Sequence, residues 1–202
     1  MSARWRLLSD CCSRCSCFSS GYLEHSSAVL NWAGERLKER RAGGGGETYT
    51  TALQKHRFQL KNLRSGEALP KLTGLDVQGV EFDSERLKGK AVLLFFTSNL
   101  YTERPNFAQL RELKERYAGR PFEIVSVMVD LKPEEAKAAV DSGKITWSTL
   151  YDKGQALMRK WQFAPCSDRL LIDHNGIIHR RAMYGDDLDE TIERLVLGAE
   201  TR

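Results

Sequence analysis

The sequence lacks any long apolar run. No hydrophobic stretch approaches the roughly 20 residues that a helix needs to cross a bilayer, so we predict no transmembrane segment. Residues 5–8 form the only apolar stretch near the N-terminus, and they are too few for the core of a signal peptide. The first twenty residues are rich in Arg and Ser, which also suits a transit peptide or a misplaced start codon. The sequence therefore does not assign a cellular compartment, and the cytoplasm is the default expectation.

A strong charge imbalance is also missing. The chain holds 31 Lys and Arg against 27 Asp and Glu, a formal net charge of +4. Basic and acidic residues mostly alternate, as in R-E-L-K-E-R at residues 111–116, which is typical of a solvated helix face. We therefore expect no nucleic-acid partner. The 202 residues are 41% hydrophobic, which allows one folded domain and an extension.

Histidine is scarce, and metal-ligand spacing is absent. The four histidines are scattered, and we expect structural roles for them: His25, His56, His174 and His179. Four of the five cysteines lie within the seven residues 11–17, where Cys12 and Cys15 form a C-x-x-C pair. A zinc site needs a second ligand pair at suitable spacing, and none follows. We expect neither a metal site nor a cofactor.

The cysteine cluster at residues 11–17 leaves three further interpretations open. A redox pair at Cys12 and Cys15 has no positioned helix or folded scaffold around it. Reversible acylation, with the apolar residues of the leader touching a membrane, is a second alternative. The third, which we favour, is a disordered leader without a function.

The chain is expected to divide into three parts. Residues 1–27 form the disordered, cysteine-rich leader. Residues 28–64 form a helical extension, with helices over 28–41 and 47–63 and a glycine linker at 43–46. Residues 65–202 form the folded domain.

Strands and helices alternate within the folded domain. Continuous apolar runs predict buried strands at 91–96, 122–129 and 170–172. Asp-His-Asn-Gly at 173–176 predicts a hairpin turn, with a return strand at 177–183. Helical spacing of apolar residues predicts four helices, at 106–117 with Pro105 in the first turn, 133–140, 153–161 and 187–199. This order predicts an α/β fold, a three-layer α/β/α sandwich around a mixed sheet.

Six segments in order carry a family resemblance. They are G-E-A-L-P at 66–70, L-D-V-Q-G at 75–79, L-K-G-K at 87–90, the strand and aspartate at 122–130, I-T-W and L-Y-D at 145–152, and L-L-I-D followed by N-G at 170–176. Together they resemble a thioredoxin-like domain of the TlpA/redoxin (AhpC/TSA-like) family, over about residues 60–200. The resemblance implies the thioredoxin fold and a dithiol site for thiol-disulfide exchange.

The sequence departs from this family at the dithiol site itself. In the family the first core strand leads into W-C-x-x-C, whereas here Phe96 leads to Pro105 through T-S-N-L-Y-T-E-R, without a cysteine. The family also places a cis-proline before the third strand. The matching position is Ser167, and Pro165 stands two residues too early. Both halves of the redox groove are therefore altered.

We expect a non-catalytic binding or scaffold domain that holds a protein partner or peptide at the residual groove. The residues expected to line this groove are Tyr101, Glu103, Arg104, Cys166, Ser167 and Arg169. The alternative is a thiol-disulfide oxidoreductase or redox sensor that uses the single thiol of Cys166. In that case Arg104 or Arg169 would favour its thiolate, and Cys12 and Cys15 would be possible partners.

Overall fold

A computed structural model describes residues 57–58, 61–98, 105–129, 132–161, 168–183 and 188–201. The chain divides into two units, Met1–Arg57 and Phe58–Arg202, and the second carries the described strands and helices. The expected leader lies outside the described residues, as does nearly all of the expected helical extension. Within that extension, residues 57–58 and 61–62 are helical.

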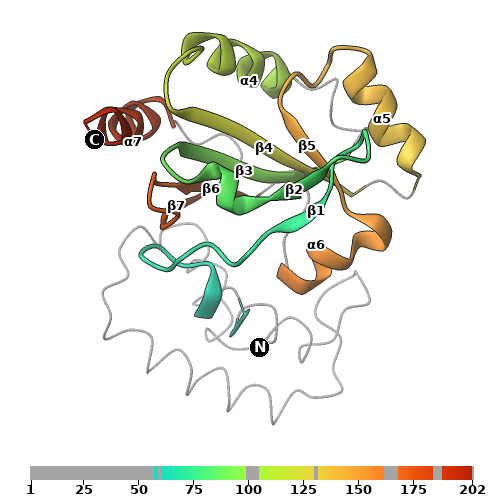
Figure 1. Cartoon of the computed structure of the whole chain (residues 1–202), viewed down its shortest axis with the longest axis horizontal. Coiled ribbons are helices and arrows are strands. Elements are labelled where there is room, and N and C mark those ends of the chain that lie inside the picture. Colours follow the sequence, from blue (N-terminus) through green and yellow to red (C-terminus); the bar gives the residue numbers. More distant parts are fainter. Residues whose placement is uncertain are drawn as a thin grey trace, which may run out of the picture. The chain divides into compact units, whose positions relative to one another are not determined.

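A five-stranded mixed sheet forms the centre of the domain (Figure 1). Its spatial order is β5-β4-β3-β6-β7. The three strands β3, β4 and β5 run parallel, whereas β6 is antiparallel to β3 and β7 is antiparallel to β6. The strands are β3 (Ala91–Thr97), β4 (Phe122–Met128), β5 (Ser148–Tyr151), β6 (Asp168–Ile172) and β7 (Ile178–Met183). The mixed sheet expected from the sequence is confirmed.

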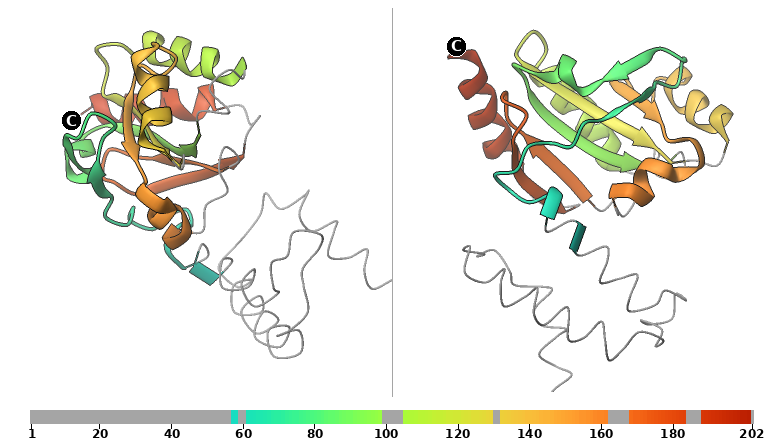
Figure 2. Two further views of the ribbon diagram at one scale, coloured as in Figure 1. Left: turned by 90° about the vertical axis from the view of Figure 1, so that its right-hand side faces the viewer. Right: turned by 60° about the horizontal axis from the view of Figure 1, so that its bottom comes forward.

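Helices cover both faces of this sheet (Figure 2). Leu93 and Phe95 of β3 point to the face that α4, α5 and α7 cover, whereas Leu94 and Phe96 point to the face that α6 and the segment before β1 cover. Both sets of side chains are almost fully buried. The helices are α4 (Pro105–Arg116), α5 (Pro133–Asp141), α6 (Ala156–Trp161) and α7 (Asp189–Glu200). The expected three-layer sandwich is therefore confirmed.

A small second sheet was not expected from the sequence. It pairs β1 (Thr73–Leu75) with β2 (Glu81–Asp83) in antiparallel register, and the short helix η2 (Ser84–Leu87) follows. The residues after β1 run along the outer edge of β5, where the backbone N–H of Val77 donates to the carbonyl of Thr149 at 3.1 Å. This contact covers part of a sheet edge that would otherwise be unpaired.

The single helix expected at residues 153–161 is wrong in detail. The chain forms the short helix η4 (Lys153–Gln155) and then α6, with a break between them. Gly154 and Gln155 both adopt positive φ angles, 65° and 59°, which a continuous helix does not contain. Glycine tolerates this conformation, and the Gln155 side chain is held by a hydrogen bond to the carbonyl of Val129 at 2.9 Å.

The C-terminal helix, expected at residues 187–199, spans Asp189–Glu200. Ile192 and Leu195 of this helix are buried, and Leu188 is buried just before it begins. Val196 occupies the last core position, whereas Ala199 is only half-buried. None of the helices in the described part of the chain is long and apolar enough to cross a membrane.

Candidate functional site

The carboxyl ends of β3, β4 and β5 lie at one edge of the sheet because these strands are parallel. Strand β6 begins at the same edge, since it runs antiparallel to β3 and Arg169 pairs with Phe95. In open α/β sheets, ligands bind at the carboxyl ends of the parallel strands. This edge is therefore where the topology favours a binding site, and we call it the carboxyl edge.

Helix α4 is fixed to the carboxyl edge by aromatic contacts. The Phe107 ring, in the first turn of α4, lies 6.3 Å from the Phe95 ring and 5.8 Å from the Trp147 ring, measured between centroids. Phe107 is 1% exposed. The helix that follows β3 therefore starts from a rigid support directly beside the end of that strand.

The opposite face of the carboxyl edge is fixed in a similar way. Trp161, the last residue of α6, is fully buried, and its ring lies 6.1 Å from the Phe96 ring. The backbone N–H of Val129 donates to the carbonyl of Thr97 at 2.9 Å, which joins the ends of β4 and β3. The described segments that stop at residue 98 and at residue 161 are thus both fixed at the end of β3.

Arg169 is the one predicted groove residue that the structure describes. It lies in β6 and is half-buried, between Phe95 of β3 and Ala182 of β7 in the pairing register. This register places it on the face of the sheet that α4 and α7 cover. The seven other predicted site residues lie outside the described residues: Cys12, Cys15, Tyr101, Glu103, Arg104, Cys166 and Ser167. The described residues contain no group of three or more His, Cys, Asp or Glu that could hold a metal ion.

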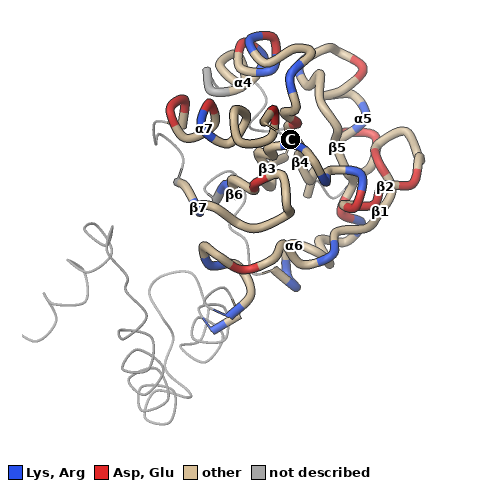
Figure 3. The backbone as a smooth tube through the Cα atoms, turned by 60° about the vertical axis from the view of Figure 1, so that its left-hand side comes forward, with Lys and Arg blue, Asp and Glu red and all other residues tan. Residues whose placement is uncertain are grey.

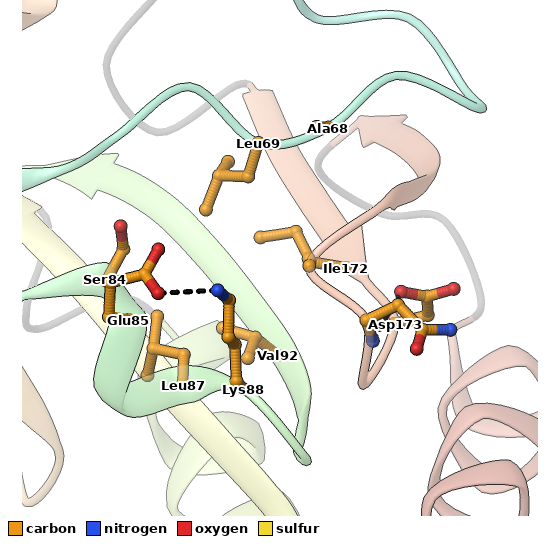
Figure 4. A pocket seen from close by; sticks show the side chains of 11 residues that line it. Ala68, Leu69, Ser84, Glu85, Leu87, Lys88, Val92, Ile172 and Asp173 are labelled. Carbon is orange, nitrogen blue, oxygen red and sulfur yellow. Dashed lines mark hydrogen bonds and ion pairs between the residues drawn. The ribbon is translucent and has the colours of Figure 1, made fainter.

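A cavity of about 260 Å³ lies near the other end of β3, beside Val92 and Ile172 (Figure 4). Two backbone hydrogen bonds frame it, from Leu69 N–H to Gly176 O at 2.9 Å and from Gly89 N–H to His174 O at 2.8 Å. Apart from the Asn-Gly turn, the sequence contains no signal for it.

The side chains around this cavity leave a ligand little to bind. Lys88 and Glu85 at its rim already form an ion pair of 2.5 Å. On its floor Val92 and Ile172 are each 1% exposed, so a bound molecule would gain little further apolar contact. We assign no ligand to this cavity.

Comparisons with known proteins agree with the fold described above. Residues 65–181 match the model of the AhpC/TSA family. The structure resembles the thioredoxin domain of a thiol-disulfide oxidoreductase from Bacteroides vulgatus, with 26% sequence identity and a TM-score of 0.59. That alignment covers 67% of this chain and 99% of the other. No match was found among curated proteins.

Two further solved structures share the fold. A thiol:disulfide interchange protein from a Bacteroides species is 25% identical, with a TM-score of 0.53, over 68% of this chain and 93% of that chain. A thiol:disulfide interchange protein of the thioredoxin family from Chlorobium tepidum is 22% identical, with a TM-score of 0.52, over 67% of this chain and 97% of that chain. The expected thioredoxin-like fold is confirmed.

Proposed function

The chain belongs to the AhpC/TSA family, and we propose that its thioredoxin-like domain binds a protein or peptide without performing thiol-disulfide exchange. The solved structures that it resembles include thiol-disulfide oxidoreductases. Exchange of this kind requires a thiolate at the start of a helix and a second thiol that resolves the mixed disulfide. The proposal depends on whether this chain has such thiols.

The absence of cysteine around the start of α4 carries the proposal. Strand β3 ends at Thr97 and α4 begins at Pro105, and the sequence contains no cysteine from Phe18 to Pro165. The hydroxyl and amide side chains between β3 and α4 cannot form a disulfide. The strand and the helix that hold the dithiol in a thioredoxin-like site are thus both present, and the sulfur atoms are not.

The same segments provide chemistry for recognition. The sequence between β3 and α4 supplies Tyr101, Glu103 and Arg104, and the sequence before β6 supplies Ser167. Tyrosine and arginine are enriched at protein interfaces because each combines apolar area with hydrogen-bonding capacity. The aromatic contacts of Phe107 hold the start of α4 in place, which reduces the entropy lost when a partner binds.

A second candidate function uses the single thiol of Cys166. Strand β6 begins two residues after this cysteine, at the carboxyl edge where α4 also starts. In this alternative the Cys166 thiolate attacks a substrate disulfide, forms a mixed disulfide with one sulfur and releases the other as a thiolate. A second thiol, from Cys12, Cys15 or an external small thiol, then attacks the Cys166 sulfur, which releases the reduced substrate and leaves Cys166 in a disulfide with the attacking thiol. A further external thiol must reduce that disulfide to restore the Cys166 thiolate.

Reduction of insulin by dithiothreitol separates the two candidates. We expect the wild-type chain to leave the rate at the background set by the reductant. A rate well above background that disappears in Cys166→Ser would establish the single-thiol enzyme. A rate that survives Cys166→Ser and disappears in Cys12→Ser would instead assign the exchange to the leader.

Binding is tested without any thiol chemistry. The probe is the insulin B chain with its cysteines carboxymethylated, followed by fluorescence anisotropy. We expect a variant with all five cysteines replaced by serine to bind it as the wild type does, and Tyr101→Ala to bind it more weakly. Leu75→Ala is the control, because Leu75 is 52% exposed on β1. Loss of binding in the cysteine-free variant would contradict the proposal.

A further inference from the structure

Cations gather on the face of the domain formed by α6 and the segment just before residue 65. The sequences 58–64 and 153–161 contain no acidic residue. They contain five basic residues, all exposed: Lys61, Arg64, Lys153, Arg159 and Lys160. We call this surface the α6 face.

The two segments of the α6 face share one support. Leu63 and Trp161 are buried in the same core cluster, and Phe58 and Leu157 pack against it. Figure 2 shows the helical residues 61–62 on the same side of the sheet as α6, away from α4. Both segments, with their exposed basic residues, therefore lie on the same side of the sheet.

Lys61, Lys153 and Lys160 of the α6 face have no ion-pair partner among the described residues. The two arginines of this face each have a partner. Arg64 pairs with Glu67 at 2.5 Å, and Arg159 donates to the carbonyl of Gly154. The opposite face of the domain differs. There acidic residues recur on α4, α5 and α7 (Figure 3), and pairs such as Arg116 and Asp189 neutralise each other.

We propose that the α6 face docks on an anionic phospholipid bilayer through these lysines. A lysine ammonium acts as a compact, mobile charge, which suits a diffuse anionic surface better than a shaped carboxylate site. The cationic excess continues into the preceding sequence, where residues 1–56 hold eight Lys or Arg and five Asp or Glu. Each lysine near such a surface contributes about a fivefold gain in binding.

The surface composition favours a bilayer over an acidic protein. A stable protein interface has buried apolar or aromatic anchors at its centre. The large apolar side chains that the described structure exposes are Leu75, Val80 and Leu197, and none of them belongs to residues 58–64 or 153–161. The cavity of Figure 4 is also lined by other residues. A charged surface whose described residues expose no large apolar side chain fits headgroups, and we expect this face to bind electrostatically, without insertion.

The test is co-sedimentation of the full chain with large vesicles. Vesicles of phosphatidylcholine with about 30% phosphatidylserine provide the anionic surface, and pure phosphatidylcholine vesicles are the neutral control. We expect binding to the anionic vesicles only. Raising the salt from about 0.1 M to about 1 M shortens the Debye length from about 10 Å to about 3 Å and should abolish it.

Variants with matched charge locate the surface. Lys61→Ala, Lys153→Ala and Lys160→Ala combined should weaken vesicle binding about ten- to a hundredfold. The control combines Lys114→Ala, Lys132→Ala and Lys137→Ala. It removes the same charge from three exposed lysines elsewhere: one in α4, one just before α5 and one in α5.

Three outcomes would overturn the proposal. One is an equal loss of vesicle binding in the two triple variants. Another is binding that persists at high salt. The third is binding of the wild type to polyglutamate but not to the anionic vesicles, which would assign the α6 face to an acidic polypeptide. The thermal unfolding curves of both triple variants should stay close to that of the wild type, since all six lysines are exposed and the contacts of Lys114 with Thr146 and of Lys137 with Asp141 lie at the surface.

Discussion

Arg120 and Glu193 face each other through two parallel hydrogen bonds, from Nη1 to Oε2 at 3.0 Å and from Nη2 to Oε1 at 2.9 Å. The same guanidinium donates to Glu200, from Nε at 2.7 Å, and lies 5.2 Å above the centre of the Tyr117 ring. This cluster joins the turn before β4 to two positions of α7 that lie about two helical turns apart. Charge-assisted pairs with bidentate geometry are the stronger kind of ion pair.

Replacing Arg120 should flatten the acid dependence of stability. Its hydrogen bonds lower the pKa values of Glu193 and Glu200 below the ordinary 4.5. A lowered carboxyl pKa stabilises the fold above that ordinary value, and the contribution is lost as pH falls through the folded-state pKa. Urea unfolding of Arg120→Ala should show a lower midpoint than the wild type at neutral pH and a smaller difference from it below about pH 4.

The control for this prediction is Arg116→Ala, which removes an exposed ion pair with a single contact to Asp189. Because exposed single pairs contribute little, its midpoint should change less than that of Arg120→Ala. An equal fall of the urea midpoint in the two variants would contradict a special role for the Arg120 cluster. An acid dependence of stability that is unchanged in Arg120→Ala would contradict it as well.

Tyr117 should make the fold sensitive to alkali. Burial, with a hydrogen bond to Glu193, raises its pKa from the ordinary 10.0 to about 12. Between these values the unfolded chain loses the phenol proton while the folded chain keeps it, so stability falls as pH rises through this window. Tyr117→Phe has no proton to lose. Its unfolding free energy should therefore depend less on pH between about pH 10 and 12, as urea titrations would measure, whereas an unchanged slope would refute the assignment.

Much of the sheet could be predicted from the sequence because several of its strands are continuous apolar runs. Residues 91–97 of β3 are all buried, and a short apolar run flanked by polar residues is typical of such a strand. The hairpin of β6 and β7 followed from the Asn-Gly pair, and Gly176 has a φ of +82° in that turn. In these cases the signal is local in the sequence.

Strand β5 was missed because its polar residues find partners far away in the chain. Thr149 is 3% exposed, and its hydroxyl lies 2.9 Å from that of Ser126, which also accepts from the Trp147 indole N–H at 3.0 Å. Buried hydroxyls are tolerated when they are hydrogen-bonded, and a residue pattern does not reveal a partner 23 positions away. At the candidate site Arg169 alone is described, so the other predicted groove residues stay predictions.

Phe107 is expected to be essential for stability because it holds α4 to the end of β3. Its ring is 1% exposed and contacts Phe95 and Trp147. Phe107→Ala should lower the unfolding free energy by about 3–5 kcal/mol, as expected for a large cavity in a core. Leu75→Ala, at a position that is 52% exposed, should change it by less than about 0.5 kcal/mol. Urea unfolding followed by tryptophan fluorescence measures both, and a small loss in Phe107→Ala would show that α4 is held in another way.

Asp152 determines where α6 begins, and its replacement should loosen that helix. Asp152 is 6% exposed, and its two carboxylate oxygens accept from the backbone N–H groups of Leu157 and Met158 at 2.8 and 2.7 Å. Asp152→Ala leaves both donors without this acceptor and should cost about 1–2 kcal/mol. Asp152→Asn keeps one acceptor oxygen, so its loss should be smaller. Hydrogen exchange at the amides of Leu157 and Met158 should accelerate in Asp152→Ala, because opening the first turn of α6 exposes both groups. Faster exchange across the whole domain with no preference for these two amides would show a global loss of stability in place of a local cap.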